Sequence, residues 1–251
     1  MKPDTELFRR YCFSPTRCFL KNSTAFYNTA VGYQSLSSNT TGVNNTASGR
    51  QALYSNTTGL SNSAFGLNAL TANITGNYNV GLGMYALNSN TASANTAIGY
   101  QAGYSNTSGV EVTAIGYQAL KLSTGNANSA VGYVALAANT TGADNVVLGS
   151  YAGYTNTTGS ANTFVGYNTG GDAGTNQTTG SSNTVIGYGA STNNFSGSVV
   201  LGRGAISTAS NQFVVGTAAH NAGAITTEAV VSDKTWSVII NGTAYKILLL
   251  A

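Results

Sequence analysis

Short apolar stretches and longer polar stretches alternate along this chain with a period of about 17 residues. The apolar stretches follow the form Asn-Thr-Ala-Val-Gly, and Asn, Thr, Ser and Gly dominate the segments between them. Eleven copies begin at Asn28, Asn45, Asn62, Asn79, Asn95, Val112, Asn128, Asn145, Asn162, Asn183 and Ser198, and a weaker twelfth covers residues 211–216. Self-similarity at a fixed short period indicates a repeat architecture in which each copy packs on its neighbours.

The positions of each repeat are numbered here from its first residue. Position 4 is apolar in ten of the eleven copies, position 5 is always Gly, and position 8 is Ala in nine. We expect the position 4 side chains to point inward and to form one continuous buried stack. The stack is expected to consist of Val31, Ile98, Ile115, Val131, Val165 and Ile186.

The repeat length and composition predict an all-β fold. Seventeen residues are too few for a helical hairpin unit, which needs about 30 or more. Asn, Thr, Gly and β-branched residues form helices poorly and suit short strands and turns. We therefore predict a parallel β-solenoid of about 11–12 coils, each with two short strands and two turns, spaced by about 4.8 Å. A row of stacked Asn side chains would satisfy its own amides along the axis.

The glycines at position 5 are predicted to be structural. A bend or a close approach between neighbouring coils at this position would exclude a Cβ atom. The residues concerned are Gly32, Gly66, Gly99, Gly116, Gly132, Gly166 and Gly187.

The sequence divides into four segments. Residues 1–21 form a basic junction, with disorder as an alternative, and they carry both cysteines, Cys12 and Cys18, as a local disulfide or as ordinary thiols. Residues 22–216 hold the repeats, and residues 217–232 form a connector. The sequence of residues 233–251 predicts a β-hairpin.

The predicted hairpin turns at an Asn-Gly pair between two apolar runs, which is a strong hairpin signal. A two-residue turn pairs Ile240 with Thr243 and continues along both runs. Because a lone hairpin is not stable in water and a solenoid end exposes unpaired edges, we expect the hairpin to cap a trimer. A swapped or disordered tail is the alternative. The cap side chains are Trp236, Val238, Tyr245 and Ile247.

The repeat resembles the head repeats of trimeric autotransporter adhesins, whose consensus runs close to Asn-Ser-x-Ala-Ile-Gly, and the related repeats of phage tail fibres. The likeness lies in residues 28–36, 95–102, 113–120 and 129–132, and it extends over about residues 22–216. It implies a left-handed β-roll that forms an intertwined homotrimer. Adhesins of that family also have a coiled-coil stalk and a membrane anchor, and this sequence shows no heptads, which favours a phage or virus-like fibre or a fragment of a longer adhesin.

Charge and chemistry narrow the functional classes. Residues 1–21 hold five cations against two carboxylates, and the remaining charges balance, so no basic groove supports nucleic-acid binding. No apolar run reaches the roughly 18 residues that span a bilayer, so we expect no membrane insertion. With one histidine, His220, and only Glu111, Asp144 and Asp172 as carboxylates in the repeats, we expect no enzyme, metal or cofactor.

Position 6 carries the candidate binding residues. They are Tyr33, Tyr100, Tyr117, Tyr133, Tyr167 and Tyr188. Tyrosine can stack on sugar rings, and it can equally fill a groove between protomers, so the row is a ligand-facing or an interface surface. The Asn-x-Ser/Thr sites at Asn39, Asn56, Asn139 and Asn156 are read as turn residues, with glycosylation as the alternative.

The sequence thus predicts an extracellular fibre module on a virion or cell surface. A phage tail-fibre segment for host attachment or spacing is the first hypothesis, with a glycan or protein receptor as its partner. The head of a cellular trimeric adhesin is the second hypothesis. An ice-binding or purely structural solenoid is the third, since a flat Thr/Asn row could order water.

Overall fold

A computed structural model describes residues 11–13, 25–170, 178–216, 235–240 and 243–248 of the chain. The chain divides into two units, residues 1–220 and residues 221–251. The first unit contains the solenoid and the second contains a hairpin, and each is described by itself.

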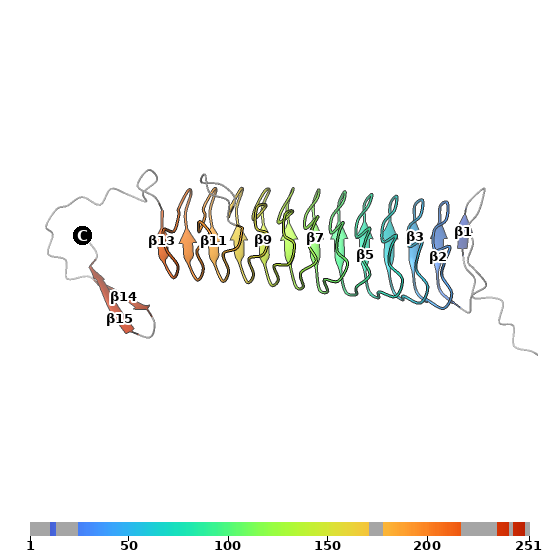
Figure 1. The fold of residues 1–251 in the computed structure, drawn as a ribbon, viewed down its shortest axis with the longest axis horizontal. Coiled ribbons are helices and arrows are strands. Elements are labelled where there is room, and N and C mark those ends of the chain that lie inside the picture. Colours follow the sequence, from blue (N-terminus) through green and yellow to red (C-terminus); the bar gives the residue numbers. More distant parts are fainter. Residues whose placement is uncertain (1–10, 14–24, 171–177, 217–234, 241–242, 249–251) are drawn as a thin grey trace, which may run out of the picture. The chain divides into compact units, whose positions relative to one another are not determined.

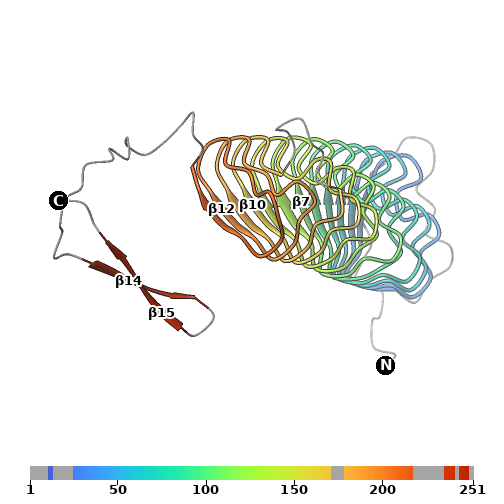
Figure 2. The ribbon, with the colours of Figure 1, turned by 60° about the vertical axis from the view of Figure 1, so that its left-hand side comes forward.

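The solenoid is built on one parallel sheet whose thirteen strands follow each other in chain order. Figure 1 shows the strands as a row of arrows, one for each coil, and Figure 2 shows the outlines of successive coils lying over one another. The strands are β1 (Tyr11–Phe13), β2 (Thr29–Val31), β3 (Thr46–Ser48), β4 (Ser63–Phe65), β5 (Val80–Leu82), β6 (Thr96–Ile98), β7 (Thr113–Ile115), β8 (Ser129–Val131), β9 (Val146–Leu148), β10 (Thr163–Val165), β11 (Thr184–Ile186), β12 (Val199–Leu201) and β13 (Phe213–Val215).

The strand register follows the sequence repeat. Thr29 pairs with Thr46 and Ala30 with Ala47, so identical positions of successive repeats lie beside each other. The same register links β3 to β4 and continues to β13. The predicted all-β parallel solenoid is therefore confirmed, and no helix occurs among the described residues.

Each coil has one strand, and the expectation of two is wrong. Positions 7 and 9 adopt positive φ angles, as in Gln51 (58°) and Leu53 (51°), and such residues interrupt the extended backbone that a strand needs. The backbone still hydrogen-bonds between coils there, for example from Leu53 N to the Ala69 carbonyl at 3.0 Å. This side of the coil is thus a hydrogen-bonded stack of turns.

The predicted inward stack at position 4 is also wrong. Position 3 is the buried one, so Ala30 and Ala97 are about fully buried, whereas Val31, Ile98, Val131 and Ile186 at position 4 are exposed. Ile115 and Val165 are half-buried. Side chains of a strand alternate between its faces, so burying Asn at position 1 and Ala at position 3 places position 4 outside. The narrow interior accepts Ala there.

The interior is a thin core of Ala and Leu. Ala at positions 3 and 8 packs against Leu at position 9, and all are essentially inaccessible to solvent. Three coils have Gly at position 9, at Gly103, Gly153 and Gly170. The ring of Phe164 lies in the space that side chains at Gly153 and Gly170 would take, and the Leu87 side chain lies beside Gly103. A Cβ on Gly170 would lie 2.9 Å from that ring. The volume lost at Gly153 is therefore filled from the next coil, and the volume lost at Gly170 is filled from within its own coil.

Two rows of buried Asn side chains, at positions 1 and 12, hold neighbouring coils together. At position 1, Asn28 Oδ1 accepts a hydrogen bond from Asn45 N at 2.8 Å, and Asn45 Oδ1 accepts from Asn62 N at 2.9 Å. At position 12, Asn56 Nδ2 donates to Asn39 Oδ1 at 2.9 Å. The predicted Asn row thus lies inside the coil, where its Nδ2 groups donate to backbone carbonyls and to side-chain oxygens of neighbouring residues.

Two further segments bear on the predicted boundaries. Strand β1 pairs with β2 in parallel, with Cys12 opposite Ala30, so the sheet begins inside the segment expected to be a junction. In the second unit, β14 (Thr235–Ile240) pairs antiparallel with β15 (Thr243–Leu248). Its register joins Trp236 to Ile247, Val238 to Tyr245 and Ile240 to Thr243, as predicted.

Candidate functional site

The tyrosine row is the set of position 6 tyrosines, and it lies on the outside of the solenoid. Each ring follows its strand by two residues, directly after the position 5 glycine. Tyr33, Tyr117, Tyr133, Tyr167 and Tyr188 are 41–55% exposed, and Tyr100 is half-buried. The row therefore lines one outer edge of the stacked coils, beyond the ends of their strands.

Neighbouring rings of the row stack on one another. Tyr100 and Tyr117 lie with centroids 5.3 Å apart at 18° between their planes, and Tyr117 and Tyr133 lie 5.0 Å apart at 10°. Tyr167 and Tyr188 form a third stacked pair, at 5.4 Å and 14°. This spacing follows from the fold, because equivalent side chains of successive coils inherit the strand separation of about 4.8 Å.

Tyr151 bridges the interruption in the row. Its coil has Ser150 at position 6, and Tyr151 at position 7 contacts Tyr133 edge-on at 5.2 Å and Tyr167 at 6.0 Å. Desolvation raises the pKa of Tyr151, and a hydrogen bond with Tyr133 and the charges of Tyr133 and Tyr167 act in the same direction. Six tyrosines, from Tyr100 to Tyr188, thus form an unbroken chain of ring contacts.

Arginines lie against rings at two places in the row. The Arg203 guanidinium carbon is 5.4 Å from the centroid of the Tyr188 ring, and that of Arg50 is 6.0 Å from the Tyr33 ring. Both separations are within the range of a cation–π interaction, and both arginines are exposed. The last ring of the chain of contacts is therefore covered on one side by a cation.

The ring spacing limits what the tyrosine row can bind. Two rings in contact are about 3.5–4.0 Å apart from plane to plane, so a sugar ring held between them would need about twice that spacing. Centroid distances of 5.0–5.4 Å leave no such room between the stacked pairs. A ligand of this row meets ring edges and hydroxyl groups, while the ring faces contact each other.

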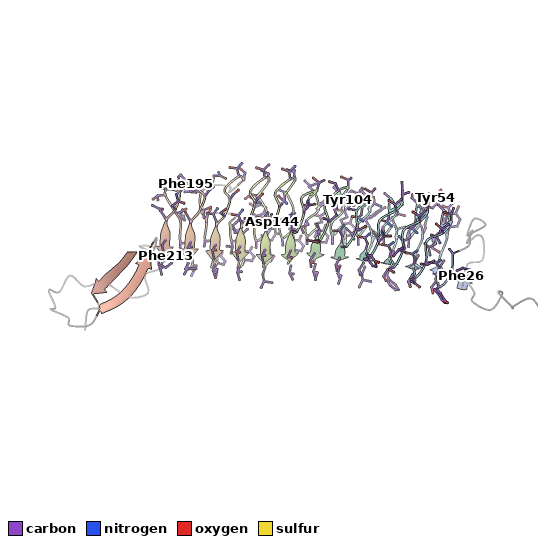
Figure 3. The ribbon with its side chains drawn as sticks, turned by 90° about the horizontal axis from the view of Figure 1, so that it is seen from below. Phe26, Tyr54, Tyr104, Asp144, Phe195 and Phe213 are labelled. Atoms are coloured by element: carbon purple, nitrogen blue, oxygen red, sulfur yellow. The ribbon has the colours of Figure 1, made fainter. Side chains whose placement is uncertain are left out.

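The second candidate surface is the outer sheet face, defined by positions 2 and 4 of β2–β13. Position 2 is mostly Thr or Ser, and position 4 is apolar in every one of these strands except β3, which has Ser48. Figure 3 shows side chains projecting outward from the row of strands. The exposed apolar residues of this face are Val31, Phe65, Val80, Leu82, Ile98, Val131, Val146, Leu148, Ile186, Phe213 and Val215.

Sequence reasoning missed this surface because it assigned position 4 to the interior. It also missed the tyrosines outside position 6, among them Tyr85 and Tyr104, whose rings are 6.2 Å apart. Figure 3 places Tyr104 and Tyr54 on the side of the solenoid away from the strands. The pair Ser150-Tyr151, where the tyrosine is displaced by one position, was the available signal that neighbouring positions share one surface.

The position 5 glycines lie where neighbouring coils come closest. A Cβ on Gly32 would lie 2.7 Å from the Gly49 carbonyl oxygen, and one on Gly66 would lie 2.8 Å from that of Gly83. The equivalent atom on Gly99, Gly116, Gly132 or Gly187 would overlap the carbonyl of the next coil, and on Gly166 it would meet the Thr169 hydroxyl at 2.8 Å. Positive φ angles at these glycines add backbone strain to any substitution.

The Asn-x-Thr sites are occupied by structural side chains. Asn39, Asn56, Asn139 and Asn156 are fully buried at position 12. Each donates its Nδ2 to the carbonyl of the glycine three residues later, at 2.8–3.0 Å. Because Nδ2 is the atom that would carry a glycan, glycosylation at these four sites is incompatible with the folded coil.

The threonines that directly follow the position 12 asparagines also donate their hydroxyl groups to neighbouring coils. Thr40 Oγ1 donates to the Thr57 carbonyl at 3.0 Å, and Thr140 Oγ1 donates to the Thr157 carbonyl at 3.0 Å. The Asn rows lie inside the coil. These threonines and the buried asparagines therefore join neighbouring coils, whereas the Thr and Ser side chains at position 2 lie on the outer sheet face.

Catalytic and metal-binding groups are sparse in the described part of the chain. Glu111 and Asp144 are both exposed and occupy equivalent corner positions two coils apart. Within the described ranges, no cluster of three or more His, Cys, Asp or Glu side chains could hold a metal ion. Asp172, His220 and Cys18 lie outside the described residues, as do the side chains of Trp236, Val238, Tyr245 and Ile247.

The described residues contain no helix with the length and apolar character needed to cross a membrane. Comparison of the chain with protein-family models, with curated proteins and with solved structures found no match.

Proposed function

We propose that this chain is a non-enzymatic segment of an extracellular attachment fibre, of the kind found in phage tail fibres, and that it works as a homotrimer. The observation that carries the proposal is the apolar outer sheet face, which continues from coil to coil along the solenoid. A contiguous exposed apolar surface of this extent is unusual for a soluble monomer and marks an interaction site.

The period of the outer sheet face supports a second copy of the chain as its occupant. Apolar side chains recur once per coil in register with the strands. Only a partner with the same axial repeat can cover each of them in an equivalent way, and parallel copies of this solenoid have that repeat. Three copies are proposed because the repeat resembles families whose β-rolls are trimeric.

The attachment role follows from what a trimer would leave accessible. The described coils carry few charges, so a neutral surface of amide, hydroxyl and tyrosine groups remains outside the proposed contact. Such a surface is suited to a neutral glycan or to an uncharged protein patch more than to nucleic acid. A cellular adhesin head would use the same faces, and the genes neighbouring the parent reading frame would separate it from a virion fibre.

The oligomeric state is tested by light scattering on the purified chain. We expect a mass three times that of the 25.5 kDa protomer. The double variant Ile98→Lys/Val131→Lys places cations on the outer sheet face, and it should dissociate the trimer because like charges would face each other. Leu122→Lys, at a site 45% exposed outside that face, is the matched control and should stay trimeric. A folded wild-type monomer would overturn the proposal.

The attachment role is tested separately with fluorescently labelled protein on intact bacterial cells, before and after periodate oxidation of surface glycans. Saturable binding by the trimer, reduced by periodate, supports a glycan receptor, and binding that resists periodate supports a protein receptor. Absence of saturable binding across a broad panel would contradict attachment and leave a purely structural fibre.

A further inference from the structure

Three pairs of tyrosines in the solenoid combine ring contact with access to solvent. They are Tyr100–Tyr117, Tyr117–Tyr133 and Tyr167–Tyr188, with centroid distances of 5.3, 5.0 and 5.4 Å. The planes of each pair are within 18° of parallel. The two members of each pair come from successive coils, so each pair spans one coil boundary.

We propose that these stacked pairs are sites of oxidative cross-linking, at which a one-electron oxidant joins successive coils through dityrosine. Each phenol gives one electron and one proton to the oxidant and becomes a phenoxyl radical. The two radicals form a carbon–carbon bond between the ring carbons ortho to the oxygens. The hydrogens on those carbons then move to the oxygens, which restores both phenols. Two electrons and two protons leave for each link, as hydrogen peroxide needs for its reduction to two waters.

The geometry favours the stacked pairs over the edge-on ones. In parallel rings at the same repeat position, equivalent ortho carbons lie on the same side and face each other along the axis. The contacts of Tyr151 with Tyr133 and Tyr167 are at 64° and 71°, which turns the ortho carbons of one ring away from those of the other. Partial exposure of Tyr117, Tyr133, Tyr167 and Tyr188 gives a small oxidant access to the ring edges.

Such a link would strengthen the contact between neighbouring coils, on which the stability of the solenoid depends. Stability in a repeat protein comes from contacts between neighbouring repeats, and opening begins by separating them. A covalent bond across a coil boundary prevents that separation. This inference is independent of the proposed attachment function, since it needs only the folded solenoid and an oxidant.

The positions of the basic residues provide a direct test. Between Arg50 and Arg203 the chain contains a single Lys or Arg, Lys121, so complete tryptic digestion gives residues 51–121 and 122–203. Tyr117 and Tyr133 lie on opposite sides of that cleavage site. After treatment of the thiol-alkylated chain with a peroxidase and hydrogen peroxide, the monomer band from a denaturing gel is digested. We expect a joined fragment that lacks two hydrogen atoms and shows dityrosine fluorescence.

Two conservative variants separate stacking from exposure. Tyr117→Phe removes the phenol from two stacked pairs, so the joined fragment should fall to background while residues 122–203 keep fluorescence from Tyr167–Tyr188. Tyr78→Phe removes a more exposed tyrosine, 62% accessible, and should leave the joined fragment unchanged. A joined fragment that persists in Tyr117→Phe, its loss in Tyr78→Phe, or links formed only between chains would each overturn the proposal.

Discussion

The inner and outer faces of the solenoid wall differ in how strictly they repeat. Inside, position 1 is Asn in most coils, position 3 is small or β-branched in all but one, and position 9 is Leu or Gly in most. Outside, position 4 is apolar in all but one coil but varies among Val, Ile, Leu and Phe, and position 6 is Tyr, Arg, Leu, Met or Ser. The inner face must satisfy the same buried polar groups and fill the same narrow volume in every coil, whereas the outer face is free to carry assembly and binding.

This contrast predicts that equivalent substitutions on the two faces will have unequal effects. Inner substitutions should lower the free energy of unfolding, because neighbouring coils cannot relax independently. Outer substitutions should change oligomerisation, cross-linking or titration while each coil keeps its structure.

The largest effect is expected for Gly116→Val. A Cβ here would overlap the Gly132 carbonyl, and its φ of 133° strains any L-residue. Strain and overpacking each cost about 1–3 kcal/mol, so we expect a loss of about 2–6 kcal/mol in unfolding free energy. Urea denaturation followed by circular dichroism measures it. Ala138→Val, at a half-buried turn position, is the control, and an unchanged Gly116→Val transition would refute the structural role of this glycine.

A pair of leucines two residues apart compares the faces directly. Leu120 is fully buried at position 9, and Leu122 is 45% exposed. Leu120→Ala should cost about 2–5 kcal/mol because it removes core contacts and leaves a cavity. Leu122→Ala should stay within about 0.5 kcal/mol of wild type. Equal midpoints for the two variants in the same denaturation experiment would contradict the assignment of inside and outside.

A smaller difference is expected between two asparagines. Asn145 Nδ2 donates to Asn128 Oδ1 and to the Gly159 carbonyl, each at 3.0 Å, and its Oδ1 accepts from Asn162 N at 3.0 Å. Asn145→Ala leaves buried partners unsatisfied and should cost about 1–3 kcal/mol.

Asn126 provides the control for that variant. Its Oδ1 accepts from Val110 N at 3.1 Å, but it is exposed, so water replaces the lost bond and Asn126→Ala should cost about 0.5 kcal/mol or less. Thermal melts of both variants at one pH and ionic strength measure which of the two loses more stability. A larger loss for Asn126→Ala than for Asn145→Ala would refute the buried Asn row as a source of stability.

The smallest effect concerns the titration of Tyr151 on the outer face. Its pKa is raised in the folded chain above the ordinary value of 10.0, so the folded state holds this proton more tightly than the unfolded state. The resulting stability is complete below the unfolded pKa and is lost as pH rises through the folded one. The melting temperature should therefore fall less steeply with rising alkaline pH in Tyr151→Phe than in wild type. The same slope in both proteins would contradict this.

Much of the fold could be predicted from the repeat itself. The 17-residue period, the glycine at every position 5 and the Asn-Gly turn between apolar runs led to the parallel solenoid and to the hairpin register of Trp236 with Ile247. These features are local, since each depends on turn chemistry or on the stacking of identical coils. The inward direction of position 4 could not be obtained in this way, because a three-residue strand of small and apolar side chains fits either orientation.

The sequence by itself determined that the chain is a stack of equivalent coils, because a repeated pattern of turn residues forces each copy into the same path. Only the tertiary structure decided which side of each strand is buried, that the far side of the coil is a stack of turns, and that the tyrosine rings lie in contact. These outcomes depend on the opposite wall of the coil and on the neighbouring coil. The buried Asn rows and the Leu side chains at position 9 occupy the interior, and the apolar side chains at position 4 are left on the outer sheet face.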